Sequence, residues 1–123
     1  MIKLVQCIHG RPGMPAQEFR QAWQRYGRLL EESRAALGIR EIELTTTLAV
    51  QANVQIIVSR ATAEPFQAMA EIWWENASIL ERALTTPEGR AAVARINAVQ
   101  EEFMDLPRCV FFFAFQDEGT ACD

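Results

Sequence analysis

The chain has 123 residues, of which 50% are hydrophobic and 23% charged, and its net charge at pH 7 is −4. This length suits one globular domain with a single modest core, and the acidic balance argues against a nucleic-acid-binding protein. No stretch approaches the roughly 18 apolar residues of a membrane span. The short, polar start is not that of a signal peptide. We therefore expect a cytoplasmic protein without a membrane partner.

Cysteine and histidine usage gives no sign of a metal site. Cys7, Cys109 and Cys122 are odd in number and lack the paired spacing of zinc ligands, as expected in a reducing cytoplasm. His9 is the only histidine, and no cysteine or carboxylate stands at ligand spacing from it. Glycine-rich nucleotide motifs are also missing from the sequence. We expect neither a metal nor a cofactor.

The first half of the chain alternates between strand and helix patterns. Residues 1–9 read as a strand that ends in the turn cluster "GRPGMP". Pro15 suits the start of a helix, and Gly38 is expected to end it. Residues 39–50 alternate and are β-branched, which indicates a second strand. The apolar helix residues share one helical face, with spacings of 4, 3, 4 and 7, at Phe19, Trp23, Tyr26, Leu30 and Leu37.

The second half holds one ambiguous segment and then a clear pattern. Within it "VQIIV" fits either a strand or a short buried helix. Residues 68–75 indicate a third strand, after which Asn76 and Ser78 offer caps for a short helix. Thr86 caps a longer helix that Pro87 begins. Its apolar face holds Ala92, Ile96, Val99 and Phe103.

The last strand is apolar on both faces. It lies within "RCVFFFAFQDE", residues 108–118, where Val110, Phe112 and Ala114 alternate with three further phenylalanines. The element order predicts a ferredoxin-like α+β fold, βαββαβ, with a four-stranded antiparallel sheet and helices on one face only. The bare face would be a large apolar patch, so we expect a homodimer whose sheets pack face to face as a dimeric α+β barrel. We assign the larger aromatics, Phe111, Phe113 and Phe115, to the partner.

Several stretches resemble the EthD family of the dimeric α+β-barrel superfamily. They are "MIKLV", "PGMPAQEFRQAW", "AEIWWENASILERALTTPEGRAAV" and "FMDLPRCVFFFAF". The resemblance covers one domain at 1–116 and leaves a polar tail at 117–123. It implies the same fold and dimer, and a connector with a short helix at 51–66. It also implies relatives that are cofactor-free isomerases, cyclases or small monooxygenases acting on aromatic or polyketide-like molecules.

The sequence departs from the family at one position. Relatives carry a His-Gly-Pro-like run one turn after the tryptophan of the first helix. The matching stretch here is "WQRYGRLL", in which Gly27 stands four residues after Trp23 and Tyr26 is its aromatic neighbour. The missing histidine leaves room for a function without catalysis.

The first helix supplies the leading candidate site residues. Trp23 and Tyr26 lie three apart on the core-facing side, so both would line any cleft between helix and sheet. Tyr26 would handle a proton, and Trp23 would form an aromatic substrate-binding wall, to which we add Phe19 and Trp73. The alternative is that these side chains only pack the core.

Two further residues are candidate proton carriers. Glu71 shares a strand face with Trp73 and would be a base with a raised pKa if it were buried. The alternative for Glu71 is an exposed carboxylate paired with an arginine. His9 would be a base at the mouth of a pocket, or a solvated residue at a strand end.

Two functions follow as expectations. The first is a cofactor-independent enzyme that acts on a small apolar or aromatic compound in a catabolic or secondary-metabolite pathway. The second is a non-catalytic homodimer that binds such a compound or has an accessory role.

Overall fold

The structure is a computed structural model that describes residues 1–116. Its elements are β1 (Ile2–Ile8), α1 (Ala16–Glu32), α2 (Arg34–Leu37), β2 (Glu41–Thr46), α3 (Gln51–Arg60), β3 (Ala68–Trp74), α4 (Ala77–Ala83), α5 (Pro87–Phe103), the 3-10 turn η1 (Leu106–Arg108) and β4 (Val110–Phe115). The predicted tail at 117–123, with Cys122, lies outside the described residues.

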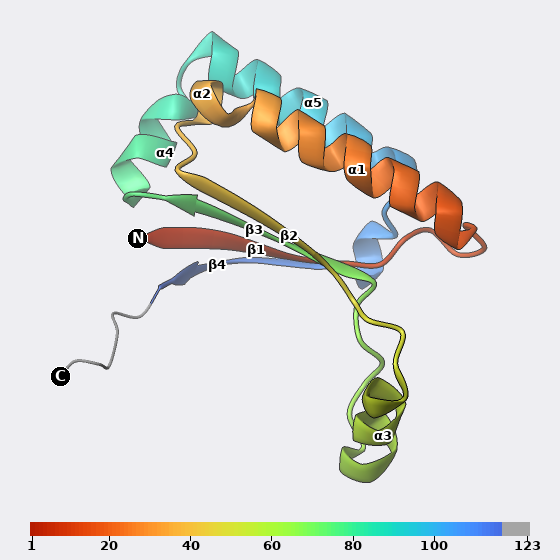
Figure 1. The fold of residues 1–123 in the computed structure, drawn as a ribbon. Coiled ribbons are helices and arrows are strands. Elements are labelled where there is room, and N and C mark those ends of the chain that lie inside the picture. Colours follow the sequence, from red (N-terminus) through yellow and green to blue (C-terminus); the bar gives the residue numbers. More distant parts are fainter. Residues whose placement is uncertain (117–123) are drawn as a thin grey trace, which may run out of the picture.

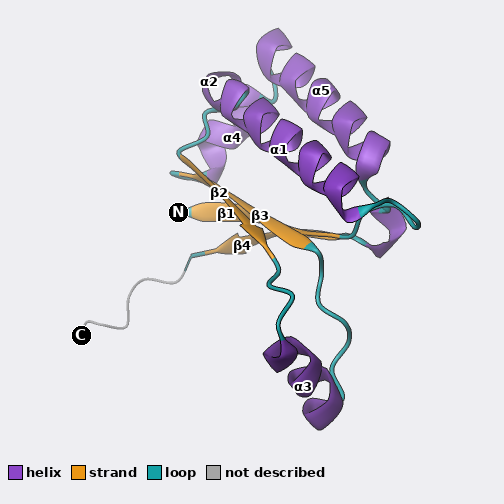
Figure 2. Cartoon of the chain, turned by 45° about the vertical axis from the view of Figure 1, so that its right-hand side comes forward, coloured by secondary structure: helices purple, strands orange, loops and turns teal. Residues whose placement is uncertain are grey.

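The strands form one antiparallel sheet in the order β2-β3-β1-β4. Helices α1 and α5 lie side by side over one face of this sheet (Figures 1 and 2). The predicted ferredoxin-like α+β fold is therefore confirmed. No helix in residues 1–116 combines the length and the apolar character needed to cross a bilayer.

The core fills the space between the helices and the facing side of the sheet. On β3, Ala70, Ile72 and Trp74 are buried against the helices, because alternate strand side chains share a face. The largest fully buried side chains include Tyr26 on α1 and Phe103 on α5. The aromatic spacing that predicted the first helix is thus the spacing of a core face.

Side-chain caps start α4 and α5. The side chain of Asn76 accepts a hydrogen bond from the Ile79 amide at 3.1 Å. The hydroxyl of Thr86 accepts one from the Gly89 amide at 2.9 Å, and Pro87 occupies the first turn. Three of the four predicted helix-start residues are confirmed, whereas Ser78 lies inside α4.

The first helix stops earlier than predicted. Helix α1 ends at Glu32, and the buried hydroxyl of Ser33 donates to the Leu29 carbonyl at 2.8 Å. Serine that bonds the preceding turn in this way bends helices. The short helix α2 follows, and Gly38 ends it in the left-handed conformation at φ 68°.

The second strand is also shorter than predicted, because the chain leaves the sheet after Thr46. Residues 47–67 form an arm that projects past the end of the sheet toward its helix-free side and carries α3 (Figures 1 and 2). The connector with a short helix, implied by the family resemblance, is confirmed. However, no residue of α3 is buried, so this helix is not the buried one that the pattern allowed.

The side of the sheet away from the helices is here called the open face. The register of the sheet reverses the predicted assignment of the two sides of the last strand. In the register, Phe113 pairs with Leu4 and Phe112 pairs with Val5. Leu4 belongs to the helix side, as its partner Ile72 does. Phe111, Phe113 and Phe115 therefore face the helix side, and Val110, Phe112 and Ala114 lie on the open face. Because both sides of β4 are apolar, the sequence does not show which side faces the helices. The size of the aromatic side chains predicted the wrong side.

Candidate functional site

Three polar side chains meet inside the apolar core. The Tyr26 hydroxyl donates a hydrogen bond to Gln6 Oε1 at 2.7 Å, and Gln100 Nε2 donates to the Tyr26 hydroxyl at 2.8 Å. These residues come from α1, β1 and α5, and all three are buried. We call this set the amide–phenol chain. It ties both long helices to a central strand.

Burial sets the protonation state of Tyr26. Loss of hydration raises its pKa to about 12, and the hydrogen bonds with Gln100 and Gln6 only partly oppose this shift. The phenol is thus neutral at any physiological pH. It serves as a hydrogen-bond relay here and is poorly suited to act as a base.

The amides at the two ends of the chain retain free hydrogen-bonding groups. Within residues 1–116, neither Gln6 Nε2 nor Gln100 Oε1 has a hydrogen-bond partner, and neither atom is completely buried. Both residues line a cavity. If both amides were reversed, the cavity would still meet one amide NH2 and one amide carbonyl. It therefore offers a bound molecule a donor and an acceptor.

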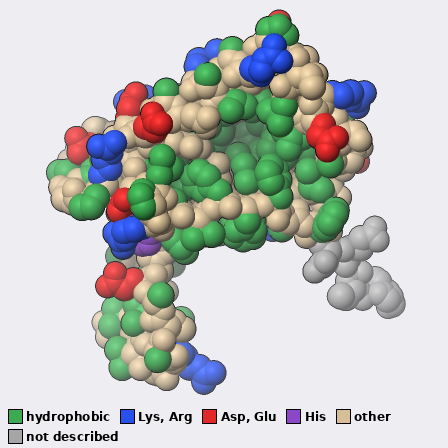
Figure 3. All heavy atoms as spheres, turned by 180° about the vertical axis from the view of Figure 1, so that it is seen from behind, with side chains coloured by type: hydrophobic (Ala, Val, Ile, Leu, Met, Phe, Trp, Pro, Cys, Tyr) green, Lys and Arg blue, Asp and Glu red, His purple; other side chains and the backbone are tan. Residues whose placement is uncertain are grey.

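That cavity, which we call the inner cleft, lies between the helices and strands β1, β3 and β4. Its volume is about 230 Å³. Figure 3 views the molecule from the side of α5 and β4, where a hollow lined by hydrophobic side chains opens between helices and sheet. The lining residues are Leu4, Gln6, Leu30, Leu37, Ile39, Ile72, Trp74, Leu80, Leu84, Val93, Ile96, Asn97, Gln100, Phe111 and Phe113.

Two neighbouring aromatic rings line the inner cleft, one buried and one exposed. Trp74 is buried at its floor, and Phe113 lies 6.2 Å away between ring centroids, tilted by 50°. Phe113 is 57% exposed, a large value for a phenylalanine. The inner cleft has no ionisable side chain among its lining residues. It suits an uncharged, flat molecule with one polar group.

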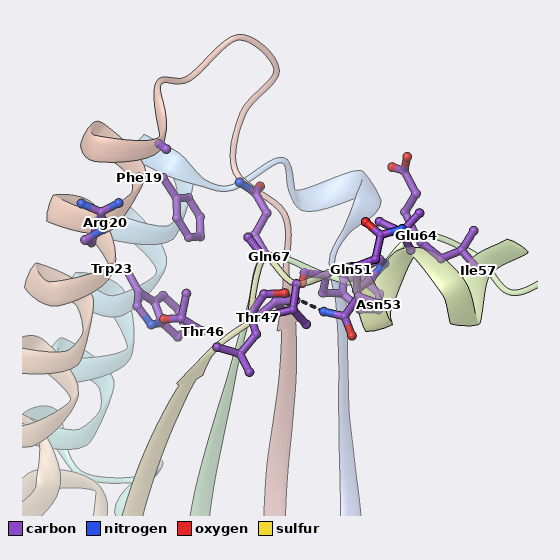
Figure 4. A pocket seen from close by; sticks show the side chains of 17 residues that line it. Phe19, Arg20, Trp23, Thr46, Thr47, Gln51, Asn53, Ile57, Glu64 and Gln67 are labelled. Atoms are coloured by element: carbon purple, nitrogen blue, oxygen red, sulfur yellow. Dashed lines mark hydrogen bonds between the residues drawn. The ribbon is translucent and has the colours of Figure 1, made fainter.

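Phe19 and Trp23 border a different and larger cavity. This arm groove, of about 780 Å³, runs between the start of α1, the end of β2 and the arm. In Figure 4, Phe19, Arg20 and Trp23 project from α1 on one side, while Ile57 and Glu64 lie on the arm. Stacking between Trp23 and Tyr26, with centroids 5.7 Å apart, links the groove wall to the amide–phenol chain.

His9 lies at the base of the arm and lines neither of these cavities. Its ring packs against Phe66 with centroids 4.7 Å apart. Burial and then the nearby Arg108 lower the pKa of His9, so the neutral imidazole predominates at pH 7. Arg108 itself pairs loosely with Asp105 at 3.8 Å.

Glu71 and Trp73 lie together on the open face, away from both cavities. The Glu71 carboxylate pairs with Lys3 Nζ at 2.9 Å, and the same ammonium lies 5.4 Å from the centre of the Trp73 ring. The partner of Glu71 is thus a lysine on the neighbouring strand. Among the described residues, the Trp73 indole N–H is buried without a hydrogen-bond partner.

Gly27, which the family resemblance aligns with a histidine, lies in close contact with Leu44 of β2. A Cβ at this position would lie 2.5 Å from Leu44 Cδ1. A side chain at position 27 would therefore require the end of the Leu44 side chain to move. Tyr26, one residue earlier, points into the core instead and forms the amide–phenol chain.

Gln6 and Gln100 escaped the sequence reasoning, although a signal was present. Gln6 interrupts the apolar alternation of Leu4 and Ile8, and Gln100 interrupts the apolar face between Ile96 and Phe103. A buried polar residue requires a partner. A glutamine at a core position of a strand and another at a core position of a helix were therefore the signal, and both bond to Tyr26.

The fold and this core site define an α+β protein of the ferredoxin-like class. The EthD domain model matches residues 11–107, and the chain belongs to the EthD family. No curated protein sequence matches the chain.

Solved structures share the fold at low sequence identity. An EthD family protein from Bacillus halodurans is 18% identical with a TM-score of 0.63, over 95% of this chain and 99% of its own. A dimeric protein of unknown function and ferredoxin-like fold from Bacteroides fragilis is 16% identical with a TM-score of 0.62, over 94% and 95%. An antibiotic biosynthesis monooxygenase is 14% identical with a TM-score of 0.51, over 96% and 100%.

Proposed function

We propose that the chain binds a small, uncharged, mostly apolar molecule in the inner cleft, with a carbonyl or hydroxyl group against the amide–phenol chain. The observation that carries this proposal is the pair of free amide groups at the end of an apolar cavity. Drug-sized ligands occupy roughly 300–1,000 Å³, and the cleft of about 230 Å³ is smaller. A compound with one or two aromatic rings fits this size and would stack near Trp74 and Phe113.

We propose an enzymatic role of the EthD type, a cofactor-independent isomerase, cyclase or monooxygenase, as the first form of this function. The Gln6 amide would donate to a substrate oxygen on which negative charge develops. The hydroxyl of Tyr26 holds that amide in place by donating to its carbonyl. The inner cleft has too little volume for a flavin or nicotinamide beside a substrate, which supports a reaction without a bound organic cofactor.

The second form is a non-catalytic binding or accessory protein, and two observations favour it. No ionisable side chain lines the inner cleft, and Gly27 stands where relatives have histidine. The two forms differ in whether wild type turns over a compound that it binds. If it does, Gln6→Met should lower kcat roughly 10²-fold, as when one oxyanion donor is removed. A binding protein would show no turnover in wild type or variant.

We also propose that two copies of the chain pack through their open faces. The apolar residues of that face include Val5, Met69, Val110 and Phe112, with the Lys3–Glu71 ion pair among them. A soluble monomer rarely exposes such a patch. The dimer leaves the inner cleft, on the helix side, open to ligands.

The binding proposal is tested with two probes that differ by one hydroxyl group, 2-naphthol and naphthalene. We expect wild type to bind 2-naphthol roughly fivefold more tightly, because one net hydrogen bond contributes about 1 kcal/mol. Gln100→Met should reduce this preference and keep the affinity for naphthalene. Gln17→Met, at an exposed glutamine of α1, is the matched control and should change neither value. Equal affinities in wild type, or an unchanged preference in Gln100→Met, would contradict the proposal.

A further inference from the structure

The arm carries unpartnered apolar side chains. Its exposed apolar side chains include Leu48 at 71%, Val58 at 78% and Ile56 at 51% exposure. No residue of α3 is buried, so these side chains gain nothing from the protomer's own core. A helix that carries valine and isoleucine in water requires a partner to cover them.

The apolar residues of α3 are not confined to the side that faces the arm groove. Val54 and Ile57 line the groove. At 100° per residue, Val58 lies about 70° and Ile56 about 130° from the centre of that side, in opposite directions around the helix. The protomer's own groove thus accounts for Val54 and Ile57 only. Something else must meet Ile56 and Val58.

The position of the arm indicates that its partner is a second copy of the chain. The arm projects to the helix-free side of the sheet, beyond the plane of the open face (Figures 1 and 2). It directly continues β2 and β3, which are two strands of that face. A second copy seated on the open face must therefore meet the arm. An α3 on the helix side of the sheet would be out of its reach.

Interface area points to the same partner. Four strands about 4.8 Å apart and six residues long at about 3.3 Å per residue give a flat area of roughly 400 Å². A stable complex of standard size buries roughly 800 Å² on each partner. The open face alone provides about half of this, and the arm is the apolar surface next to it.

We infer that the arm of each protomer packs against the second copy and forms part of the dimer interface through Ile56 and Val58 of α3. This inference rests on the proposed open-face dimer and extends it to residues 47–67. In the dimer Ile56 and Val58 leave water. Sheet contact and arm contact together give the interface its standard size.

A matched pair of double variants tests this inference by sedimentation over a range of concentrations. Ile56→Glu with Val58→Glu should weaken dimerisation roughly tenfold or more, since burying an unpaired charge costs more than the 1.4 kcal/mol that a tenfold change in Kd represents. Gln17→Glu with Gln21→Glu adds the same charge to exposed positions of α1, on the helix side of the sheet, and should change the dimer Kd less than about twofold, as surface substitutions do. Far-ultraviolet circular dichroism confirms folding, because all four residues are exposed in the protomer.

The outcomes separate this inference from the dimer on which it rests. A wild-type chain that stays at its monomer mass of 13.9 kDa overturns both. A wild-type dimer that Phe112→Asp splits, but that the Ile56 and Val58 double variant leaves intact, overturns the arm contact alone. A photo-crosslinking residue at position 58 gives an independent readout. It should yield a covalent dimer in wild-type background and only monomer if the arm is free.

Discussion

At the residue scale, Tyr26 is the side chain whose chemistry the fold alters most. A solvated tyrosine is a weak acid with a pKa near 10, whereas burial raises the pKa of Tyr26 to about 12. Its hydroxyl both donates to Gln6 and accepts from Gln100, so its hydrogen-bonding capacity is used in the core. The amides, and not the phenol, therefore retain the free groups that we propose contact a ligand.

Tyr26 is the only tyrosine, so its ionisation can be followed directly through the ultraviolet absorbance of tyrosinate. We expect the folded protein to titrate near pH 12 and the denatured chain near pH 10. Because the pKa is raised on folding, the associated stability is complete below pH 10 and is lost as the pH rises toward 12. Two pKa units correspond to about 2–3 kcal/mol of unfolding free energy. Tyr26→Phe should lack this pH-dependent loss, and a native titration near pH 10 would show that Tyr26 is solvated.

At the element scale, the approach of α1 to β2 depends on Gly27. Leu44 occupies the space that a Cβ on residue 27 would need. This contact explains why the chain tolerates glycine in the middle of a long helix, where it costs roughly 1 kcal/mol relative to alanine. It also explains why the family histidine has no place here without movement of Leu44.

A double-mutant cycle measures this contact through urea unfolding. Gly27→Ala should destabilise wild type by about 1 kcal/mol, because overpacking of roughly 1–3 kcal/mol outweighs the gain in helix propensity. In a Leu44→Ala background the clash is removed, so the same substitution should stabilise the protein by roughly 1 kcal/mol. The sign of the effect thus depends on residue 44. Stabilisation of equal size in both backgrounds would show that the helix and strand are not in close contact.

At the scale of the whole molecule, β4 contributes one face to the inner cleft and the other to the open face. Phe113 lines the inner cleft beside Trp74, and Phe112 lies next to Val5 on the other side. Both phenylalanines are substantially exposed in the protomer. One strand would therefore carry the determinants of the proposed ligand binding and of the proposed assembly on alternate residues.

Aspartate substitutions at these two neighbours should separate the two roles. Phe112→Asp should convert the dimer to monomers, measured by light scattering, because it places a charge in the sheet interface. Phe113→Asp should preserve the dimer and weaken binding of naphthalene, measured by fluorescence. The reverse pattern would mean that the helix side of β4, and not the open face, meets the second copy.

Much of the fold was predictable because the periodicities are strong. The spacing of Trp23 and Tyr26, the Thr86-Pro87 helix start and the apolar run of β4 each indicated one kind of element. The early end of α1 was not predictable, because it depends on how the buried Ser33 hydroxyl bonds the preceding turn. Nor was the face assignment of β4, since a strand that is apolar on both sides has no preferred orientation until its neighbours are known.

The candidate site was less accessible to sequence reasoning than the fold. Attention to ionisable residues led to His9 and Glu71, which the structure places at the arm base and on the open face. The inner cleft is instead lined by two glutamines, Gln6 and Gln100. Tertiary packing brings both side chains into hydrogen bonds with Tyr26. Pairing between residues so distant along the chain has no local pattern.

A crystal structure of the protein with 2-naphthol tests the central claim most directly. The account predicts that the rings lie in the inner cleft near Trp74 and Phe113. The hydroxyl should be within hydrogen-bond distance, about 2.7–3.2 Å, of the Gln6 or Gln100 amide. A probe bound in the arm groove or on the open face, with the inner cleft empty at saturating concentration, would contradict it.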